Sequence, residues 1–159
     1  MKKIGLLFGS FNPLHNGHIA LAKAAKTDAK LDEVWFVVQE QNNYKPNLGF
    51  ISYPDRKKLI VKSGLKIYEP KSNNHGHLIL DTLKEIKGYD ITLILGEDLV
   101  VSFTEWTDYN EIKQHAKIYK SSRIDGISSG VVRDRLAAGQ SIDHLVPPAV
   151  ASYLAPHQS

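Results

Sequence analysis

The sequence predicts an α/β fold: a parallel five-stranded sheet with helices on both faces and a small C-terminal helical part. Short apolar runs of strand length alternate with helical patterns along the chain, as they do in proteins built on parallel sheets. Two of these runs, Val34–Val38 and Ile91–Leu95, are almost uniformly apolar, which is typical of strands buried on both faces. No repeat or linker interrupts the pattern, so we expect residues 1–159 to form a single domain.

The expected elements begin with strand Ile4–Phe8, followed by helix Ile19–Lys30, whose alanine-rich side can face the core. After strand Val34–Val38, Ser52 begins a second helix, because a proline and an acidic residue follow in its first turn. The next elements in order are strand Leu65–Tyr68, helix Leu78–Lys87 with Gly88 as its C-cap, strand Ile91–Leu95, helix Tyr109–Ala116 and strand Lys117–Tyr119.

The C-terminal third predicts two short helices. Ser128 and Ser129 cap a helix that stops at Gly139, and a double proline then opens Ala149–Leu154. Earlier in the chain, the polar segment Gln39–Leu48 has the length of a surface loop that could serve a ligand.

Composition excludes several classes of protein. With 42% hydrophobic and 23% charged residues, the chain is neither disordered nor collagen-like. No window approaches the ~20 apolar residues of a membrane-spanning helix. The apolar run after Lys2 and Lys3 is too short for a signal peptide. There is no cysteine, which excludes disulfides and thiolate metal sites, so we expect a cytoplasmic protein with no membrane partner.

The charge balance favours small phosphorylated ligands over nucleic acid. Twenty Lys and Arg against 17 Asp and Glu give a net charge of +3, and the pI is near 9.0. The charges are scattered, and the longest basic run inside the chain is Arg56–Lys58. A nucleic-acid-binding protein would be expected to have a denser basic patch. The sequence does not set the oligomeric state.

The segment Gly9–His18, GSFNPLHNGH, lies directly after the first strand and before a helix. Ligand phosphates bind at this position in parallel sheets, beside a helix N-terminus. Gly9 and Gly17 allow close backbone approach, and His15 and His18 project to the same side of a first helical turn. A phosphate there would contact backbone N–H groups and two imidazoles. Alternatively, one histidine caps a turn and the other is an ordinary polar residue. A zinc site is less favoured, because no third ligand accompanies the pair.

Two separate motifs resemble those of the HxGH nucleotidyltransferase superfamily. Gly9–His18 matches the first, and Ile127–Arg133, ISSGVVR, matches the second in the expected order. Between them, Asp81–Leu83, Leu95–Leu99 and Trp106 look like the nicotinate/nicotinamide mononucleotide adenylyltransferases. The resemblance implies a Rossmann-like (HUP-type) sheet. It also implies adenylyl transfer from ATP to a pyridine mononucleotide, with release of pyrophosphate, in NAD biosynthesis.

The resemblance also implies roles for single residues. The expected catalytic residues are His15, His18 and Arg133. The expected ATP-binding residues are Gly9, Ser10, Phe11, His15, His18, Ile127, Ser128, Ser129 and Arg133. The expected mononucleotide-binding residues are Ser10, Phe11, Lys45, Thr82, Gly96, Asp98 and Trp106. No protein-held metal is expected, and Mg²⁺ would arrive with ATP.

The chemistry of adenylyl transfer agrees with these roles. The mononucleotide phosphate is already an anionic nucleophile, so the reaction needs alignment and charge stabilisation and no general base. His15, His18, Arg133 and a serine-capped helix N-terminus would provide cationic surroundings for the α-phosphate and the leaving pyrophosphate. Each residue alone has an ordinary structural explanation, and their order in the two motifs is what favours function.

Two departures from the family pattern leave the substrate open. Gly130 stands where the family usually has threonine, and His77–Ile79 replaces the usual Ser-Tyr-Thr of the nicotinate enzymes. We favour nicotinate mononucleotide over the nicotinamide form, on the strength of Asp81–Leu83 and the segment from Gly96 to Trp106.

Two alternatives remain. One is a pantetheine-phosphate adenylyltransferase, which the short length and Leu145–Val150 resemble, although Gly96–Asp98 and Trp106 argue against it. The other is a nucleotide-binding regulatory module without catalysis. Retention of both histidines and Arg133 argues against that alternative.

Overall fold

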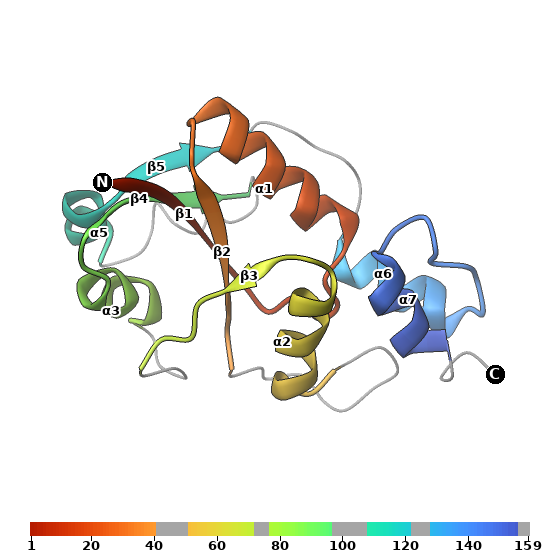
Figure 1. The fold of residues 1–159 in the computed structure, drawn as a ribbon. Coiled ribbons are helices and arrows are strands. Elements are labelled where there is room, and N and C mark those ends of the chain that lie inside the picture. Colours follow the sequence, from red (N-terminus) through yellow and green to blue (C-terminus); the bar gives the residue numbers. More distant parts are fainter. Residues whose placement is uncertain (41–50, 72–76, 97–107, 122–127, 156–159) are drawn as a thin grey trace.

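Five strands form one sheet, in which every neighbouring pair is parallel, in the order β3-β2-β1-β4-β5 (Figure 1). The computed structural model describes residues 1–40, 51–71, 77–96, 108–121 and 128–155. The strands are β1 (Lys2–Gly9), β2 (Glu33–Val38), β3 (Lys66–Ile67), β4 (Tyr89–Leu95) and β5 (Lys117–Lys120). The predicted parallel five-stranded sheet is therefore confirmed.

The helices of the described residues are α1 (Asn16–Asp28), α2 (Tyr53–Lys62), α3 (Leu78–Glu85), α5 (Tyr109–His115), α6 (Ser129–Ala137) and α7 (Pro148–Leu154). Helix α1 begins three residues earlier than predicted, because His15 caps it. The prediction that Gly88 caps α3 is wrong: Ile86 is the C-cap, and Gly88 (φ 84°) turns the chain before β4. Gly139 (φ 72°) does end α6 as predicted, directly after the C-cap.

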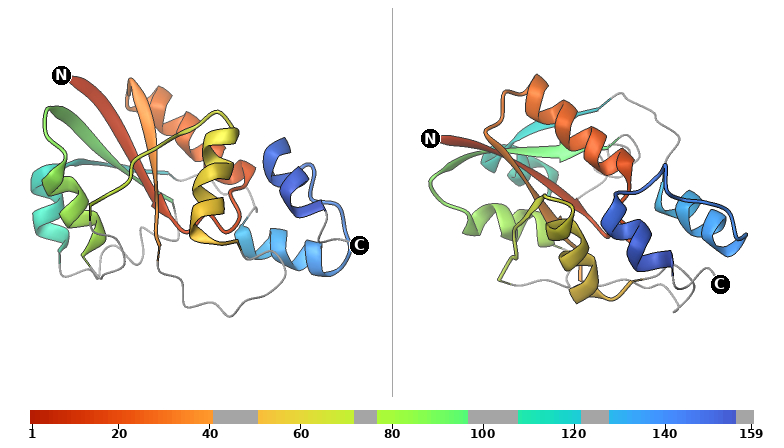
Figure 2. Two further views of the ribbon diagram at one scale, coloured as in Figure 1. Left: turned by 60° about the horizontal axis from the view of Figure 1, so that its bottom comes forward. Right: turned by 45° about the vertical axis from the view of Figure 1, so that its right-hand side comes forward.

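Helices cover both faces of the sheet, and β1 contributes to the core on each side. Leu7 packs in the cluster that contains buried residues of α1, α2, α6 and α7. Ile4, Leu6 and Phe8 point the other way, into the cluster formed with α3 and α5. This alternation is the period-two pattern of a strand. Helices α6 and α7 lie together at one end of the molecule in both views of Figure 2.

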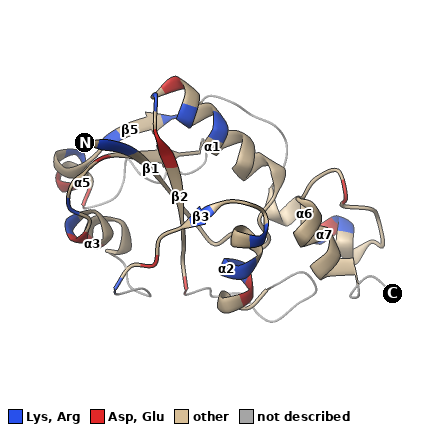
Figure 3. Cartoon of the chain, in the orientation of Figure 1, with Lys and Arg blue, Asp and Glu red and all other residues tan. Residues whose placement is uncertain are grey.

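Since all five strands are parallel, their carboxyl ends meet at one edge of the sheet, and helices α1, α2, α3 and α5 begin there. Acidic and basic side chains are interspersed over the described elements, and no described helix carries charges of one sign alone (Figure 3). Among the described residues, no helix has the length and apolar character needed to cross a bilayer.

Candidate functional site

The candidate site is built on the loop between β1 and α1, at the carboxyl edge of the central strand. Its two histidines bind the backbone through the same ring atom. The Nδ1 atom of His15 accepts the N–H of Gly17 at 3.0 Å, and the Nδ1 atom of His18 accepts the N–H of His15 at 3.1 Å. The rings stack with centroids 3.6 Å apart. The predicted placement of both imidazoles on one side is confirmed, and one of them does cap the helix.

These contacts fix which nitrogen can donate. An Nδ1 atom that accepts a hydrogen bond carries no proton, so a neutral ring holds its proton on Nε2. Burial, with a smaller contribution from His15, lowers the pKa of His18 well below 6.5. His18 is therefore neutral at pH 7, whereas cationic surroundings were expected from it. It offers a directed Nε2–H donor in place of a charge.

The first turn of α1 does not offer free backbone donors, contrary to prediction. The N–H of Asn16 donates to the carbonyl oxygen of Leu145 at 2.7 Å, and that of Gly17 to His15 Nδ1. The N–H of His18 donates to the carbonyl oxygen of His15 at 3.1 Å. The Asn16 side chain adds a bond to the carbonyl oxygen of His144 at 3.2 Å. The segment before α7 thus occupies the donors at the N-terminus of α1. The two imidazoles are then the main hydrogen-bond donors that this loop offers to a ligand.

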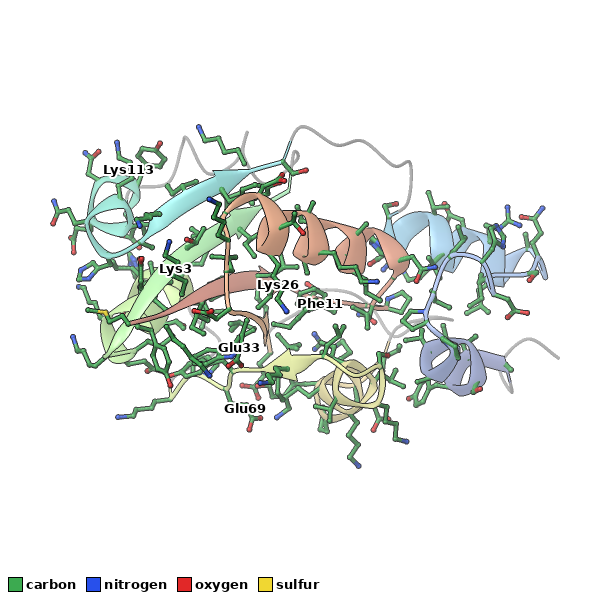
Figure 4. All side chains as sticks on the ribbon, turned by 45° about the horizontal axis from the view of Figure 1, so that its top comes forward. Lys3, Phe11, Lys26, Glu33, Glu69 and Lys113 are labelled. Atoms are coloured by element: carbon green, nitrogen blue, oxygen red, sulfur yellow. The ribbon has the colours of Figure 1, made fainter. Side chains whose placement is uncertain are left out.

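Phe11 packs against His18 and has an unusual backbone conformation. Its φ is 50°, in the left-handed region, and its side chain is 3% exposed. The ring meets the His18 ring edge-on, with centroids 4.7 Å apart, and also contacts Phe36 of β2. Figure 4 labels Phe11 close to α1. A Cβ atom at Gly9 would lie 3.2 Å from Phe11 Cζ, so Gly9 makes room for this ring. Strained residues of this kind are common at functional sites.

The second motif contacts the first directly, although the contacting residues lie 116 and 121 positions apart in the sequence. Ser128 is the N-cap of α6, and its hydroxyl accepts the N–H of Val131 at 3.1 Å, as predicted. The hydroxyl of Ser129 donates to the carbonyl oxygen of Pro13 at 3.0 Å, and Arg133 Nη1 donates to that of Asn12. The fold therefore brings Arg133 and the serine pair to the loop that carries the histidines.

Asn12 is a buried part of the same loop. It is 1% exposed, and the Asn12–Pro13 peptide bond is cis. Its Oδ1 atom accepts the N–H of Ile51 at 2.7 Å, which joins the loop to the residue before α2. Its Nδ2 atom is buried and has no hydrogen-bond partner among the described residues.

The expected mononucleotide-binding residues are placed unevenly. Thr82 is fully buried, and its hydroxyl donates to Leu78 at 2.7 Å inside α3, so its side chain does not lie at an accessible surface. Gly96 directly follows β4, at the same edge as the histidines. Ser10 is half-buried at the end of β1. Lys45, Asp98, Trp106 and the ATP-site residue Ile127 lie outside the described residues.

Helix α3 begins at Leu78, so the N–H groups of Leu78 and Ile79 fall in its first turn. His77 precedes them, and its Nδ1 atom lies 2.6 Å from an oxygen of Asp108 at the start of α5. A hydrogen bond to Asp108, together with its charge, raises the pKa of His77 above 6.5. No local sequence pattern predicts this contact, because Asp108 lies 31 residues after His77.

Among the described residues, the site has hydrogen-bond donors but no cluster of carboxylates. Within the described part of the chain, no three His, Asp or Glu side chains are grouped closely enough to hold a metal ion. Mg²⁺ normally needs carboxylate or phosphate oxygens. Among the described residues, the site therefore offers hydrogen-bond donors and a guanidinium in place of carboxylate ligands.

Known proteins are similar to this chain over most of its length. The family model described as cytidylyltransferase-like matches residues 6–152. A protein of Shouchella clausii named "Probable nicotinate-nucleotide adenylyltransferase" is 31% identical over 94% of this chain and 92% of its own length. A protein of Cytophaga hutchinsonii with the same name is 33% identical over 80% of this chain and 71% of its own length.

Solved structures share the fold. A crystal structure from Vibrio parahaemolyticus has a TM-score of 0.74 at 23% identity and covers 98% of this chain and 99% of its own. The Plasmodium falciparum nicotinic acid mononucleotide adenylyltransferase complexed with NaAD has a TM-score of 0.70 at 20% identity, covering 99% of this chain and 96% of its own.

Proposed function

We propose that the chain, which belongs to the cytidylyltransferase-like family and within it to the nicotinate-nucleotide adenylyltransferases, transfers the adenylyl group of ATP to nicotinate mononucleotide. It is a nucleotidyltransferase of NAD biosynthesis. The observation that carries the proposed site is the contact between the two motifs, through Ser129 with Pro13 and Arg133 with Asn12.

In the proposed reaction, a phosphate oxygen of the mononucleotide attacks the α-phosphorus of ATP. A P–O bond forms to the nucleophile, and the bond from the α-phosphorus to the bridging oxygen breaks, so that pyrophosphate leaves with the electron pair. The nucleophile is anionic, and no proton has to be removed from it. The protein's contribution is therefore alignment and charge stabilisation.

The described residues divide this contribution between two imidazole donors and the Arg133 cation. His15 and His18 present Nε2–H groups, whose positions are fixed by the backbone contacts of Nδ1. Hydrogen bonds from such preorganised donors strengthen as charge develops in the transition state. Arg133 supplies the positive charge beside the same loop and would bind the leaving pyrophosphate.

Mg²⁺, when bound to ATP, neutralises phosphate charge and orients the oxygens. The phosphates are proposed to hold it, because the described residues offer donors at this site. A chelator should abolish turnover, and added Mg²⁺ should restore it. One tightly bound zinc per chain in elemental analysis would contradict this proposal and would reopen His15 and His18 as metal ligands.

The start of α3 adds support to the preference for nicotinate. The first-turn N–H groups of Leu78 and Ile79 are donors, which suit a carboxylate better than a carboxamide, since the amide also needs an acceptor. The partners proposed are small molecules, with no nucleic acid and no membrane, in the cytoplasm.

A pyrophosphate-release assay tests the proposal. ATP is supplied with nicotinate mononucleotide, nicotinamide mononucleotide or phosphopantetheine, and the His18→Ala variant is the control for contaminating activity. We expect the highest kcat/KM with nicotinate mononucleotide. A tenfold preference for the amide, about 1.4 kcal/mol, would overturn the choice of pyridine. Turnover of phosphopantetheine alone would favour the other adenylyltransferase branch, and no turnover would favour a regulatory module.

The variant Trp106→Ala tests whether Trp106 stacks on the pyridine ring of the mononucleotide. An aromatic side chain that stacks on the ring adds affinity without distinguishing acid from amide. We expect KM to rise for both pyridine mononucleotides together, with KM for ATP nearly unchanged. A change in KM for ATP alone would remove Trp106 from the mononucleotide site.

A further inference from the structure

Arg56 is a buried cation for which the proposed chemistry has no direct use. It lies in α2, and only 1% of its surface is exposed. In the sequence it belongs to a basic run that would be expected at the surface, and arginine is rarely buried unless it is paired. Its burial therefore calls for a specific set of partners.

Those partners are four backbone carbonyl oxygens. Arg56 Nη1 donates to Ser10 at 2.8 Å and to Gln39 at 2.9 Å. Arg56 Nε donates to Ile51 at 3.0 Å. The fourth contact, from Nη2 to Glu40, is 3.3 Å long. A guanidinium has five N–H donors in a fixed planar arrangement, and most of them are used here.

The four acceptors come from three separate parts of the chain. Ser10 directly follows β1, Gln39 and Glu40 follow β2, and Ile51 precedes α2. One rigid side chain therefore sets the distance between the loop after β1, the carboxyl end of β2 and the beginning of α2. Glu40 and Ile51 also flank residues 41–50 in the sequence, so the same group ties together the residues on both sides of that segment.

A short path leads from Arg56 to the histidines. Ser10 precedes Phe11, the left-handed residue whose ring contacts His18 edge-on. A second connection runs through Ile51, whose N–H binds Asn12 Oδ1 at 2.7 Å while its carbonyl oxygen binds Arg56. The loop is thus held at Ser10 and at Asn12, on either side of Phe11.

We propose that Arg56 is a positioning residue for adenylyl transfer, which holds the loop between β1 and α1 in the conformation that places His18. This inference rests on the proposed function for its kinetic consequence, but its structural part concerns the loop alone. A displacement of reacting groups by about 1 Å can cost on the order of 100-fold in rate.

Arg56→Lys is the variant that tests it. Lysine keeps the charge but carries one nitrogen, which cannot span carbonyls in three segments. We expect kcat to fall ~10- to 100-fold, with KM for both substrates within about threefold of the parent. The matched control is Arg135→Lys, since Arg135 Nε also donates to a backbone carbonyl, that of Ser141 at 3.0 Å, but on the exposed side of α6. It should leave kcat unchanged.

Imidazole ¹⁵N spectra without substrate give a readout independent of turnover. The Nδ1 signal of His18 should shift in Arg56→Lys and not in Arg135→Lys, because its bond to the His15 N–H depends on the loop. Asn12→Ser shortens the side chain that accepts the N–H of Ile51, and it should lower kcat in the same way. This variant replaces Arg56→Lys in the test if Arg56→Lys does not fold.

A folded Arg56→Lys protein with unchanged His18 signals, or with kcat within threefold of the parent and only a lower Tm, would overturn the inference. If the parent fails to release pyrophosphate, the proposed function fails, while the His18 signals still test the positioning role.

Discussion

Phe11 and Lys30 adopt nearly the same left-handed backbone conformation at opposite edges of the sheet. Phe11 has φ 50° and follows β1 at the carboxyl edge. Lys30 has φ 54° and lies between the end of α1 and the start of β2, at the amino edge. For a residue with a Cβ atom this conformation costs roughly 1–2 kcal/mol. The two residues carry a similar cost for different reasons.

The surroundings explain the difference. Phe11 is buried against His18 and Phe36, and the tethers of Arg56 and Asn12 lie on either side of it. Lys30 is exposed and only completes a helix end, where the N–H of Leu31 binds the carbonyl oxygen of Lys26 at 2.9 Å. The strained backbone at Phe11 therefore places its ring against His18. The strained backbone at Lys30 only forms a turn, and glycine adopts that conformation at lower cost.

The polar groups of the two edges differ in the same way. At the carboxyl edge, Asn12, His15 and Arg56 are all buried and bind the backbone. At the amino edge, Glu33 is shared by Lys2 and Lys66, whose side chains are 59% and 65% exposed. Buried polar contacts fix a geometry, while exposed ion pairs are worth little to stability. Substitutions at the two edges should therefore have different consequences.

The largest effect is expected for His18→Ala at the carboxyl edge. It removes the directed Nε2–H donor, and kcat should fall roughly 100- to 1,000-fold, as for the loss of one preorganised oxyanion donor. ATP binding should weaken much less. Because burial lowers the pKa of His18 well below 6.5 in the free protein, the parent's kcat/KM, which reports the free enzyme, should show no titration of His18 between pH 6.5 and 8. Steady-state kinetics over that range measure both. Turnover within a few-fold of the parent would mean that His18 has no such role.

Phe11→Gly separates the backbone from the ring. Glycine relieves the left-handed strain, worth about 1 kcal/mol, but removal of a buried phenyl ring costs about 3–5 kcal/mol. We expect a net loss of about 2–4 kcal/mol in the free energy of unfolding, together with a lower kcat because His18 loses its edge contact. Urea unfolding and steady-state kinetics measure the two parts. A variant as stable as the parent would show that the ring is not what holds this conformation.

Lys30→Gly is the matched change at the amino edge. No buried side chain is lost, so relief of the strain should raise the free energy of unfolding by about 0.5–1 kcal/mol, with kcat unchanged. Thermal unfolding of the two glycine variants side by side compares the edges directly. Destabilisation by Lys30→Gly would contradict the distinction drawn between them.

The smallest effect is expected at Glu33, and it depends on pH. Hydrogen bonds from Lys2, then Lys66 and Trp35, lower the pKa of Glu33 from 4.5 to about 2. A carboxyl whose folded pKa is lowered stabilises the protein above its unfolded pKa, and that contribution is lost as pH falls from about 4.5 towards 2. The Tm of the parent should therefore fall more steeply over this range than that of Glu33→Gln. At pH 7 the parent should be more stable than Glu33→Gln by a small margin, because exposed ion pairs contribute little, and the two Tm curves should converge in acid. Parallel Tm curves in acid would rule out this coupling.

The sheet and the two motifs could be predicted because they depend on local patterns. The apolar runs place the strands, and the order of Gly9–His18 and Ile127–Arg133 marks the site. Even within these segments, the predicted start of α1 is three residues late, because a histidine is an uncommon helix cap and Ile19 is the first apolar residue of the helical pattern.

What the sequence could not provide are contacts made to backbone atoms from distant segments. Arg56 binds carbonyl oxygens, which every residue has, so no residue type at position 10 or 39 signals its partner. The same holds for the carbonyl oxygen of Leu145, which takes the N–H of Asn16 across almost 130 residues. Only the folded chain shows that the first turn of α1 is already occupied.

The central place of β1 has a consequence for synthesis on the ribosome. Its register with β4 joins Leu7 to Ile94, 87 residues later. At about 5–20 residues per second, the ribosome needs roughly 4–17 s to make that interval. For most of that time the histidines have already been made, but β1 has no partner strand on its β4 side. The nascent chain therefore carries its chemical motif next to an open, apolar strand edge, which is where chaperones bind and where premature association between chains begins.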